Sequence, residues 1–94
     1  METQELREEA KRKIDEVFND YEMMERKLNN ASDEIKERNK ERMKKLEDSK
    51  LELTQRFNEM KNGSENRVRE MKPAFDNSMQ SFKRGFTELS SVFK

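Results

Sequence analysis

The stretch NNASDE, residues 29–34, decides between two helical folds. Its two asparagines can end one helix, and Ser32, followed by two acids, can cap the next. Against a break, Ala31 stays in step with the apolar residues before it, and neither glycine nor proline interrupts the chain here. The register favours one continuous helix over residues 3–61, and a break near residues 29–33 remains the alternative.

Apolar residues before and across this stretch recur at alternating steps of four and three. Side chains at these spacings share one face of a helix. A sustained pattern of this kind is typical of a coiled-coil seam. The seam is expected at Leu6, Ala10, Ile14, Val17, Tyr21, Met24, Leu28, Ala31 and Ile35.

The seam becomes polar at Arg38, Asn39 and Arg42. We interpret this interruption as a solvent-exposed stretch, and a device that fixes helix register is the alternative. Beyond it the apolar pattern resumes, with Lys50 in one slot. The resumed seam consists of Met43, Leu46, Leu53, Phe57 and Met60.

The segment KNGSEN, residues 61–66, predicts a clear break at residues 62–64. Gly63 can adopt the left-handed conformation that ends a helix, and Ser64 can cap the next one. A second helix is expected over about residues 64–93, with a kink or a fresh start at Pro73. Its apolar stripe includes Phe75, Met79, Phe82, Phe86, Leu89 and Phe93.

These elements predict an all-α, coiled-coil-like helical hairpin that forms one domain over residues 1–94. A continuous first helix would be about 87 Å long. The phenylalanine-rich helix would cover half of its seam, so a second chain would have to cover the rest. A break near residue 30 would instead give a three-helix bundle. In both cases the expected partner of the phenylalanine stripe is the preceding seam.

The segment LELTQRFNEMKNGSENRVREMKPAFDNSMQSFKRGFTELSSVFK, residues 51–94, resembles a group of small bacterial coiled-coil proteins associated with stress responses. A charged helix, a Gly-Ser break and an amphipathic helix carry the resemblance. The group usually has a tryptophan after the break, where this chain has Arg67 and Val68, and Pro73 also departs from the pattern. The resemblance implies a helical fold and no catalytic residues.

Composition argues against an enzyme. The 94 residues include no cysteine and no histidine, so the usual thiol nucleophile and general base are missing. Glu-x-x-His metal pairs cannot form, and two glycines cannot build a phosphate-binding loop. We therefore expect no cofactor and no metal. The basic run at residues 36–45 is interrupted by Glu37 and Glu41, so nucleic acid is not an expected partner.

Charged residues make up 45% of the chain, and the 21 acids balance the 21 bases. A chain this polar buries little apolar surface, so long helices and association are the expected sources of stability. The sequence thus predicts a non-enzymatic, cytoplasmic assembly or interaction module that forms a homo-oligomer or binds a helical partner. The alternative is binding to a membrane surface through the amphipathic segment at residues 73–94.

Overall fold

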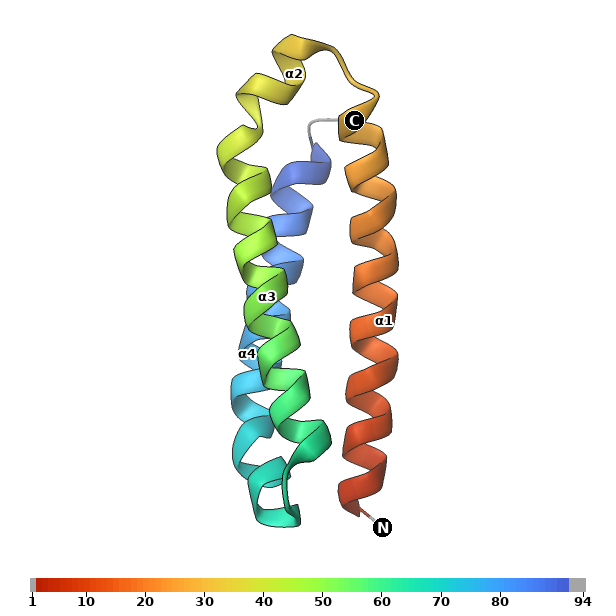
Figure 1. The fold of residues 1–94 in the computed structure, drawn as a ribbon, viewed down its shortest axis with the longest axis vertical. Coiled ribbons are helices and arrows are strands. Elements are labelled where there is room, and N and C mark those ends of the chain that lie inside the picture. Colours follow the sequence, from red (N-terminus) through yellow and green to blue (C-terminus); the bar gives the residue numbers. More distant parts are fainter. Residues whose placement is uncertain (1, 92–94) are drawn as a thin grey trace.

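The computed structural model describes residues 2–91, which form four helices and no strand in that range (Figure 1). Helix α1 spans Glu2–Asn29, α2 spans Asp33–Arg38, α3 spans Lys40–Asn62 and α4 spans Glu65–Ser90. The short α2 turns the chain at one end, and the three long helices lie side by side (Figure 1). The described chain measures 49 × 18 × 18 Å. The predicted all-α fold is confirmed in its bundle form.

The chain breaks between α1 and α2 at residues 30–32. Ser32 has extended backbone, and its Oγ accepts a hydrogen bond from the Ile35 amide at 3.3 Å. The favoured continuous helix over residues 3–61 is therefore wrong, and the alternative break near residues 29–33 is the one found. The turn lets α1 fold back on α3 and α4, so its seam is buried within one chain, whereas a straight helix would leave half of that seam in water.

Asn39 forms the corner between α2 and α3. It is only 2% exposed, and its Nδ2 donates to the Ile35 carbonyl at 2.8 Å. Its Oδ1 accepts from Arg42 at 3.2 Å. The exposed interpretation of the polar interruption holds for Arg38 and Arg42, but it is wrong for Asn39. Asn39 can be buried because its amide is satisfied by the turn that it stabilises.

The turn between α3 and α4 contains Gly63 and the N-cap Ser64, whose Oγ accepts from the Arg67 amide at 3.3 Å. Gly63 has φ −88° and ψ 166°, so the predicted left-handed conformation is wrong. Glycine is favoured here for its size: an added Cβ would lie 2.7 Å from the Glu59 carbonyl oxygen. Arg7 of α1 joins this end by donating to the Met60 carbonyl at 3.0 Å and to that of Gly63.

Pro73 lies inside α4, which continues through it. The predicted fresh helix start at this residue is therefore wrong. Pro73 removes one backbone donor, but it lies on the exposed side of the helix, where water can satisfy the freed carbonyl. The opposite side of α4 is buried, at Val68, Met71, Phe75, Ser78, Met79, Phe82 and Leu89.

One core runs along the bundle axis, and all three long helices contribute to it. α1 contributes Ala10, Ile14, Val17, Tyr21 and Met24, and α3 contributes Leu46, Leu53 and Met60. Leu53, Val68 and Leu89 are fully buried. Since burying one large apolar side chain is worth about 1.5–3 kcal/mol, this core supplies the main stabilisation of the bundle.

Candidate interaction groove between α1 and α4

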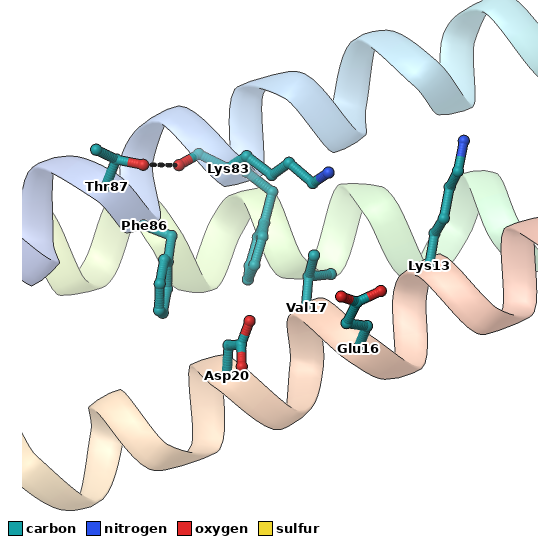
Figure 2. Close-up of a pocket in the computed structure, with 8 residues that line it drawn as sticks. Lys13, Glu16, Val17, Asp20, Lys83, Phe86 and Thr87 are labelled. Atoms are coloured by element: carbon teal, nitrogen blue, oxygen red, sulfur yellow. Dashed lines mark hydrogen bonds between the residues drawn. The ribbon is translucent and has the colours of Figure 1, made fainter.

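A groove of about 300 Å³ opens on the side of the bundle where α1 faces the C-terminal half of α4 (Figure 2). Val17 and Phe86 point into the space between the two helices (Figure 2). We call this feature the α1–α4 groove. It is lined by Lys13, Glu16, Val17, Asp20, Phe82, Lys83, Phe86 and Thr87.

The floor of the α1–α4 groove is apolar and its rim is charged. Val17 and Phe82 belong to the core, and Phe86 is half-buried against it. Rim charges come from both helices, as Glu16 and Asp20 on α1 and Lys83 on α4. A floor of this kind favours an apolar ligand face, and a mixed rim favours a ligand with charges at its edges.

A smaller depression of about 120 Å³ extends the α1–α4 groove toward the C-terminal end of α1. Asp20 and Phe86 line both hollows, which joins them into one surface. Met23, on this surface, is 52% exposed. Among the described residues, only Leu51, on α3, is another large apolar side chain with comparable exposure. Met24 and Lys27 complete the lining of the depression.

An aromatic layer supports the groove from inside. The Phe82 ring lies 5.8 Å from that of Phe18 and 6.1 Å from that of Tyr21, centroid to centroid, and both pairs are tilted. Lys50 places its ammonium 5.2 Å from the Phe18 centroid and 4.6 Å from the Tyr21 centroid. The predicted seam slot of Lys50 is therefore filled by a cation on aromatic faces, with its stem toward the core.

Two ionisable groups near the groove have shifted pKa values. Burial is the main cause that raises the pKa of the Tyr21 phenol, and the nearby charges of Glu47 and Glu25 and a hydrogen bond with Glu25 add to it. The pKa of Glu9 is lowered, chiefly by its hydrogen bond with Lys13. The Lys13 ammonium lies 3.0 Å from the Glu9 carboxylate, so this rim cation is directed toward the preceding turn of α1.

The side chains that line the groove are charged or apolar, apart from the hydroxyl of Thr87. The chain has neither histidine nor cysteine, and in residues 2–91 no group of three acidic side chains is placed to hold a metal ion. Thr87 donates its hydroxyl to the Lys83 carbonyl at 2.9 Å, within its own helix (Figure 2). A nucleophile activated by a neighbouring base is not formed by the lining residues.

Most residues of the predicted seam lie together in the core. The buried ones are Ala10, Ile14, Val17, Tyr21, Met24, Leu28, Leu46, Leu53, Met60, Phe75, Met79, Phe82 and Leu89. Phe57 and Phe86 are half-buried against the core. Phe93 lies outside the described residues.

Sequence reasoning missed three contributors: Met23, Phe18 and Arg7. Met23 and Phe18 each stand one position from a seam residue, so an alternating four-three pattern passes over them. Phe18 is nevertheless packed against the core, because α1 is flanked by two helices and needs a wider apolar face than a two-helix seam. Arg7 carries no sequence signal, since its carbonyl partners become close only after folding.

Comparison of the chain with protein-family models, with curated proteins and with solved structures found no match. The resemblance to small stress-associated coiled-coil proteins therefore stays a prediction. No helix within residues 2–91 has the length and apolar character needed to cross a bilayer.

Proposed function

We propose that this chain is a non-enzymatic helical interaction module that self-associates by accepting a helix of a second copy in the α1–α4 groove. The observation that supports the proposal is the apolar floor at Val17 and Phe86, continuous with the exposed Met23. The proposal keeps the cytoplasmic location expected from the sequence. A stress-related role rests on the resemblance alone.

A helix is the ligand best suited to a groove of this shape. An amphipathic helix lays its apolar face into a groove between two helices and places its charged edges over the rim. Covering Met23 and the exposed edge of Phe86 would remove apolar surface from water, which favours association. The rim residues Glu16, Asp20 and Lys83 would then select the direction and register of the incoming helix.

The folded bundle does not need this ligand to close its core. Core side chains such as Phe82 and Leu53 are already at most 1% exposed in one chain. Association through the groove would therefore join folded monomers, and its free energy would come from the groove surface alone. We expect a modest affinity, because area at the rim of an interface contributes less than a fully buried centre.

The alternative of membrane-surface binding is less well supported, because most of the described part of its contact face is buried. The stripe residues Phe75, Met79, Phe82 and Leu89 are buried between α1, α3 and α4. Lipid binding through this stripe would require α1 to leave the bundle, which would expose the part of the core that α1 covers. The groove needs no such opening, and for this reason we favour the interaction module.

A labelled groove tests the proposal. The chain has no cysteine, so Thr87→Cys provides a single attachment point for an environment-sensitive fluorophore at the exposed rim. Titrating the labelled chain with unlabelled chain should shift the emission to the blue as the groove is covered. The same label at Gln55→Cys, exposed on α3, is the control and should not respond. An unchanged emission at Thr87 up to millimolar chain would contradict the proposal.

A further inference from the structure

We infer that the second copy contributes its α1, packed antiparallel about a two-fold axis at Met23. The C-terminal half of that helix then covers the Met23 end of the α1–α4 groove, and Asp20 of each chain faces Lys27 of the other. This inference rests on the proposed function and specifies the geometry of the association. The surface that carries it is the depression formed by Asp20, Met23, Lys27 and Phe86.

The spacing along α1 makes this surface self-complementary. Asp20 precedes Met23 by three residues and Lys27 follows it by four, so all three lie on one face of the helix. The midpoint between the acid and the base falls within half a residue of Met23, or about 0.75 Å along the axis. A two-fold axis at that point reverses the helix and places each carboxylate opposite an ammonium of the other copy.

Neither charge is used inside its own chain. In the described part of the chain, Asp20 and Lys27 have no ion-pair partner, although both are exposed. Their neighbours on α1 behave differently: the Lys11 ammonium lies 2.8 Å from the Asp15 carboxylate. Asp20 and Lys27 are therefore both available to a second chain.

The apolar centre of the contact also pairs with itself. A two-fold interface uses the same patch on both chains, and here that patch contains the 52% exposed Met23 beside the half-buried Phe86. The flexible methionine side chain adapts to an identical neighbour and makes favourable contacts with aromatic rings. Met23 of each copy would lie between the Met23 and Phe86 side chains of the other.

Two further charges of the groove lining lie near this contact, Glu16 of α1 and Lys83 of α4. Glu16 lies one turn before Asp20 on α1, and the same axis places it beyond the end of the second copy's α1 at Asn29, where it opposes no charge of that helix. Lys83 of α4 lines the same groove as Glu16. The incoming Lys27 would thus face Asp20, with the second acid, Glu16, one turn away along α1.

Charge exchange tests the inference. By sedimentation equilibrium from micromolar to millimolar chain, wild type should form a dimer. Asp20→Lys and Lys27→Asp should each weaken it about tenfold, because each converts two attractive contacts into two repulsive ones. The double variant D20K/K27D restores opposite charges and should recover most of the wild-type affinity. Asp48→Lys, which makes the same charge change on the exposed face of α3, should leave the dimer unchanged.

The outcomes separate the inference from the proposed function. Circular dichroism melts would first establish that each variant remains a folded bundle. If wild type dimerises and covers the Thr87 label, but the double variant fails to recover, the two-fold contact at Met23 is wrong and the groove proposal stands. If wild type stays monomeric throughout the range, the inference and the proposed self-association both fail.

Discussion

The Lys50 ammonium lies 4.6 Å from the centroid of the buried Tyr21 ring, and so ties α3 to α1 in the middle of the bundle. A cation over an aromatic face is attracted by the partial negative charge on that face, which arises from the ring quadrupole. The long lysine stem fills a seam position while the charged end stays near the surface. A seam slot that looks like a defect in the sequence is therefore a contact between two helices.

Removing this charge should weaken the bundle. We expect Lys50→Gln, which keeps much of the stem, to lower the free energy of unfolding by about 1 kcal/mol, the usual size of a partly desolvated cation–π contact. Urea denaturation followed by circular dichroism measures the change. Lys44→Gln, exposed on the same helix, is the matched control and should have little effect. Equal stability of the two variants would contradict the contact.

Tyr21 should make the fold sensitive to alkali. Burial raises its pKa in the folded chain above the ordinary value near 10. Below pH 10 both the folded and unfolded states hold the proton, so this contribution to stability is fully present. Above pH 10 the unfolded state releases the proton first, and stability falls as the pH rises.

The chain has one tyrosine and no tryptophan, so ultraviolet absorbance reports tyrosinate at Tyr21 alone. We expect tyrosinate to form only well above pH 10, together with loss of helix. Tyr21→Phe should unfold less steeply in the same pH range. Ordinary titration near pH 10 in a chain that remains helical would show that the phenol is open to water.

Phe82 is the central aromatic of the core, and shortening it should be costly. Its side chain is 1% exposed and contacts the rings of Phe18 and Tyr21. We expect Phe82→Ala to remove about 3–5 kcal/mol, a large share of the about 5–15 kcal/mol typical of a whole domain. Ser81→Ala, exposed beside it, should change little. Unchanged thermal stability with lost liposome co-sedimentation would instead favour the membrane alternative.

Gly63 should tolerate substitution less well than Gly85. A Cβ at Gly63 would lie 2.7 Å from the Glu59 carbonyl oxygen, a rigid backbone atom, and we expect Gly63→Ala to cost about 1–3 kcal/mol. A Cβ at Gly85 would meet only the Leu46 Cδ1 atom, at 3.3 Å. That side chain can shift, and alanine gains about 1 kcal/mol of helix propensity. Thermal melts should therefore rank Gly85→Ala above Gly63→Ala, and the reverse order would contradict the turn geometry.

Periodicity located the core well because each long helix has one buried face. Ile14, Tyr21 and Leu28 follow the four-three pattern and are buried, as is the phenylalanine stripe at Phe75 and Phe82. Met23 could not be found in this way, because its exposure depends on how far α4 covers α1. Such coverage is a property of packing and leaves no trace in the spacing of apolar residues along α1.

The sequence left open whether the helix continues or breaks at residues 30–32. Ala31 and Ile35 keep their apolar spacing whether the helix continues or turns, so register does not separate the two folds. The local free energies of the broken and continuous helix are also similar. An N-cap such as Ser32 stabilises the break by about 0.5–2 kcal/mol, and the backbone hydrogen bonds gained by a straight helix are worth a similar amount. Packing of α1 on α3 and α4 decides between the two folds, and this packing energy involves residues distant along the chain.

Small-angle X-ray scattering over a concentration series tests the central claim, that each chain closes its own core as a three-helix bundle and then self-associates as a folded unit. Extrapolated to zero concentration, the scattering should give the mass of one chain and a radius of gyration close to the 15.0 Å of the bundle. With increasing concentration the mass should rise toward that of a dimer. A persistent dimer with a maximum dimension of about 85 Å or more, as two extended hairpins would give, would contradict the account.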